Sequence, residues 1–187
     1  MTGAPTREEG FTLIELMVAM AIMAIILGSL TAGVIVGLRT GDETTNRLAG
    51  SNDAQLVSIW LPADVQSTGN QLSDVVATPT ANTECSGISN VLRLKWRATE
   101  TAGGATNTYV AAYAISQAST GEWRLIRYSC VNGGTAVKHV VARNLASSSA
   151  ATIATSGTKV TMTVTEKATA ANPTSYSFSV SGNRRTP

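Results

Sequence analysis

A single carboxylate, Glu15, lies at the start of a long apolar stretch of this sequence. From Leu16 to Leu38 the chain has no charged residue, no proline, and no asparagine or glutamine. An ionised carboxylate at membrane depth costs on the order of 3 kcal/mol on insertion scales, so Glu15 must find a partner or be neutral. The chemistry that this position predicts is pairing with a cationic group.

A cationic partner would arise if the chain were cut between Gly10 and Phe11, because the cut creates a new α-amino group at Phe11. In a stack of such helices, Glu15 of one subunit would then meet the Phe11 amine of a neighbour. A buried ion pair is weak evidence of stability, but it can set the register of an assembly. The spacing therefore predicts that Glu15 and Phe11 fix the axial register of a stack.

The apolar stretch is long enough to cross a bilayer. A helix over Leu16–Leu38 would extend roughly 35 Å, and no later segment has comparable length and hydrophobicity. The alternative is a secretory signal peptide, whose apolar region spans about 7–15 residues. The length of the run and the position of Glu15 disfavour that alternative, and an Ala-x-Ala motif at Ala19–Ala21 lies in mid-run. We expect one membrane-spanning helix.

The stretch from Gly10 to Ala19, GFTLIELMVA, closely resembles the class III signal of type IV pilins and type II secretion pseudopilins. The resemblance covers about residues 7–38. It implies that a prepilin peptidase cuts after Gly10 and methylates the amine of Phe11, and that Glu15 acts in subunit docking. The partners it implies are other pilin or pseudopilin subunits, the peptidase, an inner-membrane assembly platform and membrane lipid.

The same resemblance divides the chain into three parts. It implies a prepilin leader at 1–10, a transmembrane and filament-core helix at 11–38, and an extracytoplasmic globular domain at 39–187. The protein would be a single-pass protein of the cell membrane that enters a filament on assembly. The leader departs from the family pattern, because Arg7 is offset by Glu8 and Glu9. Membrane orientation is therefore inferred from the motif more than from charge.

Composition excludes several classes of function. Charged residues make up only 14 % of the chain and the net charge is +2, which disfavours a strongly basic nucleic-acid binder. One histidine and two cysteines are too few for a zinc or iron–sulfur site. No nucleophile elbow or phosphate loop is recognisable, and His139 reads as a surface residue of a strand. We expect no enzyme activity, no metal and no cofactor.

The two cysteines, Cys85 and Cys130, form an even pair in the region after the apolar helix. A domain outside the cytoplasm favours a disulfide between them. Such a bond would close a loop of about 46 residues, worth about 4 kcal/mol by the chain-entropy argument. Two free buried thiols are the alternative.

The region after the span predicts a second helical stretch over 39–61. Its apolar stripe is expected to consist of Leu48, Leu56, Ile59 and Trp60, with Asp53 among the polar residues on the opposite side. Pro62 lacks the amide that would bond to Ser58, so a kink or a restart is expected there. The helix should end near 67–70.

Alternating and β-rich segments predict an antiparallel sheet that covers this helix. The expected strands are 92–97, 109–115, 123–130, 137–145, 160–164 and 176–180. The strands 109–115 and 123–130 are expected to form a hairpin around the turn-rich segment 117–121. The fold class is α+β and pilin-like, with a long N-terminal helix packed on an antiparallel β-sheet. This layout most resembles the class J minor pseudopilins and the minor pilins of type IV pili.

Three functions follow from this reading. The first is a minor pilin or pseudopilin that primes or assembles a type IV pilus or secretion pseudopilus. The alternatives are a major pilin of the filament shaft, and a surface module for adhesion or DNA binding. Arg93, Lys95 and Arg97 line one strand face and could contact DNA phosphates, although a solvated face is the preferred interpretation.

Overall fold

The computed structural model describes residues 12–69, 74–77, 80–82, 85, 88–99, 104–168 and 175–185. Its N-terminal element is α1 (Leu13–Ser67), a helix of 55 residues. The chain divides into two units, one ending at Thr44 and the other beginning at Thr45, so the boundary lies within α1. In the first unit, every described side chain from Thr12 to Thr44 is exposed.

Helix α1 continues through Pro62 and ends at Ser67. The restart expected at Pro62 does not occur, because buried residues on both sides of the proline, Val57 and Val65, hold both turns in the core. The end near residue 67 is confirmed. There the Thr68 amide and hydroxyl both donate to the Val65 carbonyl, at 3.2 and 2.6 Å, which satisfies one of the last carbonyls of the helix.

The second unit contains a five-stranded antiparallel sheet in the order β1-β4-β5-β6-β7. Its strands are β1 (Val75–Val76), β4 (Leu92–Thr99), β5 (Thr106–Gln117), β6 (Trp123–Val131) and β7 (Val137–Leu145). The predicted hairpin is confirmed, with Tyr113 opposite Arg127 and Gln117 opposite Trp123. The strand predicted over 137–145 is confirmed as β7.

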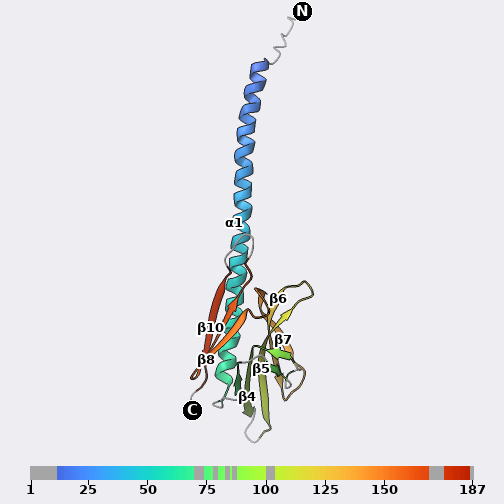
Figure 1. Ribbon diagram of the computed structural model, residues 1–187, viewed down its shortest axis with the longest axis vertical. Helices are drawn as coiled ribbons and strands as arrows, with labels where there is room; N and C mark the ends of the chain where they lie inside the picture. The colour runs from blue at the N-terminus through green and yellow to red at the C-terminus, as the bar shows by residue number, and fades with distance from the viewer. Residues whose placement is uncertain are drawn as a thin grey trace, which may run out of the picture. The chain divides into compact units, whose positions relative to one another are not determined.

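A second, three-stranded sheet has the order β10-β9-β8, where the expectation was one sheet (Figure 1). Its strands are β8 (Ala151–Ser156), β9 (Lys159–Thr165) and β10 (Ser177–Asn183); β2 (Thr80–Asn82) and β3 (Ile88–Asn90) form a separate pair. Strands β9 and β10 were predicted. Strand β8 was missed because its Ala- and Thr-rich sequence has weak alternation, and Gly157, at φ 58°, makes the tight turn into β9. The loop expected over 168–173 lies mostly outside the described residues.

The main core joins the last turns of α1 to both larger sheets, which flank this part of the helix in Figure 1. Val57, Leu61 and Val65 of α1 are fully buried, at spacings of four residues that place them on one helix face. They pack in one cluster with Leu92, Leu94, Ala111, Tyr113 and Leu125 of the five-stranded sheet and Val160, Met162 and Val164 of β9.

The helix face that is buried differs from the predicted stripe. Leu48 and Ile59 are 66 % and 64 % exposed, whereas Asp53, expected among the polar residues, is only 7 % exposed. The prediction was wrong for Leu48 and Ile59, because it followed the bulkiest apolar side chains, whereas Leu56 and Trp60 are half-buried and Trp60 packs against the core. The buried face instead carries Asp53 and Asp64 beside its valines and Leu61, so two acidic residues interrupt its apolar pattern.

Strand β10 approaches the helix closely at Gly182. A Cβ atom at this position would lie 2.9 Å from the Cα of Pro62 and 2.9 Å from the Cβ of Val65. Only glycine fits such a backbone approach without displacing the strand or the helix. Gly182 therefore sets how tightly the three-stranded sheet packs on α1.

Candidate processing and docking site

Glu15 closes a hydrogen-bonded box at the first turn of α1. Its Oε2 accepts from the Thr12 amide at 3.3 Å and from the Thr12 hydroxyl at 3.1 Å. In return, the Glu15 amide donates to the Thr12 hydroxyl at 3.3 Å. Thr12 is thus the N-cap and Glu15 the third helical residue of a capping box, which satisfies amides that the helix would otherwise leave unpaired.

The capping box was not predicted, although its signal is present in the sequence as Thr12-Leu13-Ile14-Glu15. It gives Glu15 a role within its own chain, besides the pairing between subunits expected of it. Gly10 and Phe11 lie outside the described residues. The structure therefore brings Glu15 and Thr12 together, and the expected pairing of Glu15 with the Phe11 amine stays a prediction.

The span that follows is a helix of 26 residues, Leu13–Leu38, apolar and long enough to cross a membrane. Its side chains are exposed, with Ile25 at 73 % and Leu38 at 67 %. Ser29 and Thr31 donate their hydroxyl protons to the carbonyls of Ile26 and Leu27, each at 2.8 Å. These bonds satisfy polar groups that lipid could not satisfy. Glu15 is the one charged residue of the span.

The structure contains a disulfide between Cys85 and Cys130, the bond that the sequence favoured. Their Cα atoms are 5.8 Å apart, within the usual range for this bond. Cys85 is fully buried, and both cysteines pack against Val110 of β5. The bond joins β6 to the segment between β2 and β3.

A buried ion pair connects α1 to the five-stranded sheet. Arg127 of β6 donates from Nε and Nη2 to the two carboxylate oxygens of Asp64, both at 2.7 Å. The Tyr113 hydroxyl donates to Asp64 Oδ2 at 2.6 Å. The Trp60 ring lies over the guanidinium at 4.4 Å and stacks on His139. All three hydrogen bonds to Asp64 run between the helix and one face of the sheet.

Burial and this geometry shift the pKa values of the network. Burial by itself would lower the pKa of Arg127, but hydrogen bonds to Asp64 and its negative charge outweigh burial and raise it. Burial, reinforced by the charge of Asp64, raises the pKa of Tyr113. Arg127 therefore stays charged and Tyr113 stays a neutral donor over the whole physiological range. The arrangement holds the helix in register with the sheet.

This network was not predicted from the sequence. One signal was available, since Asp64 lies seven residues after Val57 and three after Leu61, on the apolar face. A charged residue at such a position requires a buried partner. Which partner it finds depends on strand register, because Arg127 and Arg124 are both on β6 but only Arg127 faces α1.

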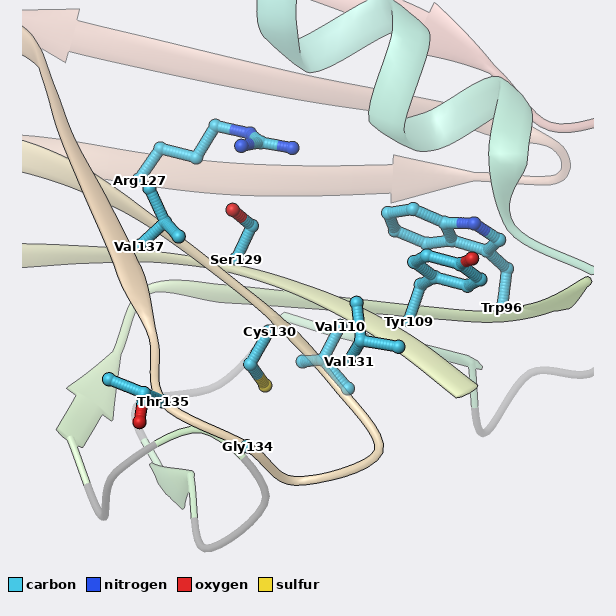
Figure 2. A pocket seen from close by; sticks show the side chains of 10 residues that line it. All are labelled: Trp96, Tyr109, Val110, Arg127, Ser129, Cys130, Val131, Gly134, Thr135 and Val137. Atoms are coloured by element: carbon cyan, nitrogen blue, oxygen red, sulfur yellow. The ribbon is translucent and has the colours of Figure 1, made fainter. Parts of the chain in front are cut away.

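A cavity of about 360 Å³ lies on the sheet beside this network (Figure 2). Its lining includes Trp96 and Tyr109, whose rings stack at 5.7 Å, and the side chains of Arg127, Ser129 and Val137. The described residues that line it include neither His139 nor a carboxylate. The described lining thus presents aromatic and apolar groups beside Arg127 and Ser129, with no pair of side chains arranged as a general acid and base.

The other residues that the sequence singled out lie on the sheet surface. His139 is exposed on β7, as expected. Arg93 and Lys95 of β4 are half-buried, and Arg97 is exposed. Among the described residues, no three His, Cys, Asp or Glu side chains are grouped so that they could hold a metal ion.

Residues 5–31 match the family model described as the prokaryotic N-terminal methylation motif. The motif indicates a precursor of the type IV pilin or pseudopilin type, processed by prepilin peptidase and assembled with other subunits. Together with Leu13–Leu38, the one helix among the described residues that could span a membrane, it fits a membrane-anchored subunit of the pilin type. Comparisons with curated proteins and with solved structures find no match for this chain.

Proposed function

We propose that this chain is a minor pilin or pseudopilin, cleaved after Gly10, methylated on Phe11 and docked through Glu15 during assembly of a type IV pilus or secretion pseudopilus. The observation that carries the proposal is the methylation motif at 5–31, which leads into an exposed apolar span with Glu15 as its one charge. Residues 1–10 are then the leader and 11–38 the helix of the filament core. Residues 39–187 form the extracytoplasmic domain.

The first test is intact mass and N-terminal sequencing of the protein purified from its native membrane. The proposal expects a mature chain that starts at N-methylated Phe11. A chain that starts near Thr31 or Ala32 would show secretory processing instead. That result would leave Glu15 without a docking role and would overturn the proposal.

Two variants separate the two roles of Glu15. Glu15→Gln keeps a side chain that can close the capping box but removes the charge, whereas Glu15→Val removes both. If the charge docks the subunit, both variants should be cleaved normally and should enter filaments at least tenfold less than the parent. If Glu15→Gln assembles normally, docking by the charge is wrong and only the cap matters. Glu122→Gln, on the surface of the second unit, is the matched control.

The disulfide supports an extracytoplasmic position for the second unit, because such bonds form and persist in oxidising compartments. The test is a thiol-alkylation assay on intact cells. The proposal expects no alkylation of Cys85 or Cys130 without reductant, and protection of the domain from proteases until the outer layers are opened. Alkylation of both thiols in freshly lysed cells would place the domain in the cytoplasm.

The assignment as a minor subunit is supported by the order of elements after the span. The C-terminal part of α1, residues 51–66, is followed later in the chain by the β5–β6 hairpin and β7, and this is the layout that resembles class J. Abundance in sheared filaments tests it. A few copies per filament would support the minor role, and stoichiometric abundance along the shaft would establish a major pilin.

A further inference from the structure

One buried carboxylate, Glu166, takes no part in the contacts described so far. It follows β9, and its backbone forms a single bridge with Leu145 at the end of β7. Its amide donates to the Tyr176 carbonyl at 2.8 Å, just before β10. The residue is 9 % exposed, and its buried Oε1 has no hydrogen-bond partner among the residues that the structure describes. A buried ionised oxygen without a partner is costly, so this group requires an explanation.

Helix α1 presses directly on this carboxyl group. A Cβ atom at Gly50 would lie 2.8 Å from Glu166 Oε2 and 3.2 Å from Oε1, so the carboxyl group lies directly against the helix backbone at this glycine. One turn later on the helix is Asp53, a second buried carboxylate, which accepts the Arg143 amide at 2.6 Å. The negative charge of Asp53 disfavours ionisation of Glu166.

A cavity of about 220 Å³ adjoins the two carboxylates. Each packed element contributes to its lining: Asn52 and Asp53 from α1, Arg143 and Asn144 from β7, and Lys167 beside Glu166. A hard divalent cation would need several oxygen ligands, and the two cationic side chains at this cavity would repel it. Binding a proton does not require several oxygen ligands, and it removes the negative charge of Glu166 that Asp53 repels.

We propose that Glu166 is a proton-binding site of the second unit: the neutral carboxyl packs against Gly50, and its ionisation drives it away from Asp53 and loosens the contact between α1 and the sheet ends. The proposal goes beyond the proposed function and does not depend on it. Burial, followed by the charge of Asp53, raises the pKa of Glu166 from 4.5 to about 7. Burial also raises the pKa of Asp53, although its bond to the Arg143 amide opposes this.

The direction of the pH effect follows from proton linkage. Between pH 4.5 and 7 the folded chain keeps a proton on Glu166 that the unfolded chain has lost. Stability is therefore full below the unfolded pKa and falls as pH rises through the folded pKa. Between pH 5 and pH 8, the folding equilibrium constant should fall on the order of fiftyfold.

The experiment measures the free energy of unfolding of the second unit as a function of pH, using the full chain in detergent micelles. We expect the parent to lose stability from pH 5 to pH 8, and Glu166→Gln, a permanently neutral side chain of the same shape, to lose most of that dependence. Glu122→Gln is the matched control and should behave as the parent, because Glu122 is an exposed partner of Arg124.

A second measurement keeps the proposal testable if Glu166→Gln does not fold. Carboxyl titration by nuclear magnetic resonance should find one glutamate that titrates near neutral pH, and Asp53→Asn should move that titration to lower pH. A parent chain whose glutamates all titrate near pH 4.5, or an unchanged pH dependence in Glu166→Gln, would overturn the proposal. A stabilisation by calcium or magnesium that Glu166→Gln abolishes would also overturn it, in favour of a cation site.

Discussion

The two units of the molecule use apolar side chains in opposite ways. In the first unit, the leucines, isoleucines and valines of Leu13–Leu38 are all exposed, and an added methyl group at Gly28, Gly33 or Gly37 would meet nothing within 4 Å. In the second unit, Val57, Leu61 and Val65 of the same helix are fully buried. The first unit therefore needs lipid or neighbouring helices to cover its apolar side chains, whereas the second unit buries its apolar side chains within itself.

Polar groups show the same contrast. Ser29 and Thr31 bond to carbonyls three or four residues back, inside their own helix. Asp64 bonds to Arg127 and Tyr113, which are 63 and 49 residues away. The apolar span satisfies its polar groups within its own helix, whereas the second unit satisfies Asp64 through residues far along the chain. Substitutions in the two units should accordingly differ in what they disturb.

The largest effect should come from Asp64→Ala, which leaves the Arg127 guanidinium buried without its partner. Breaking a buried pair from one side costs about 3–5 kcal/mol. We expect the second unit to unfold at markedly lower denaturant, and the first unit to insert in membranes as before. The double variant Asp64→Leu with Arg127→Met is the control, and it should recover much of the loss. Equal losses in the single and double variants would contradict the ion-pair explanation.

The next effect should come from the disulfide. Replacing both Cys85 and Cys130 by serine should cost up to about 4 kcal/mol, since the bond restrains a long loop of the unfolded chain. Thermal unfolding with and without reductant checks this. Reductant should lower the unfolding temperature of the parent and leave that of the double serine variant unchanged. A parent whose unfolding temperature does not change when the bond is fully reduced would refute the prediction.

A matched pair on α1 tests which helix face is buried. Leu61→Ala removes a fully buried side chain and should cost about 3 kcal/mol. Ile59→Ala removes an exposed side chain two positions away and should change stability by less than about 0.5 kcal/mol. Chemical denaturation of both variants measures the difference. Similar losses would mean that the outer face of the helix is also covered.

The smallest effect concerns two glycines. Gly182→Ala places a methyl group 2.9 Å from the Pro62 Cα, so we expect a loss of about 2 kcal/mol as β10 moves away. Gly33→Ala meets open space, and as a better helix former it should not destabilise the isolated chain. Circular dichroism on heating checks both. A destabilising Gly33→Ala would show that the span packs against something in the isolated chain.

Local patterns predicted much of the second unit. The alternation of Leu92 and Leu94 with Arg93 and Lys95 identified β4, and the paired segments around 117–121 identified the β5–β6 hairpin. Period-2 alternation is visible in the sequence because strand geometry imposes it residue by residue. The division of the strands into separate sheets left no such local signal.

The helix face was the main error. Periodicity places Leu48 and Ile59 in a plausible stripe, but the side chains that are buried are those that meet the sheets. The identity of the covered face depends on where strands far along the chain come to lie. Asp53 appears as an ordinary polar residue until Arg143 is placed beside it, and the position of Asp64 indicates a buried partner without identifying it as Arg127.

The sequence by itself determined the methylation motif, the apolar span with Glu15, the cysteine pair and most strands. Each is a property of neighbouring residues: a length, a spacing or an alternation. Only the tertiary structure decided the buried face of α1, the Asp64–Arg127 pair and the burial of Glu166 against Gly50. These depend on contacts between residues far apart in the chain, and burial, which sets the cost of a charge, exists only once those contacts form.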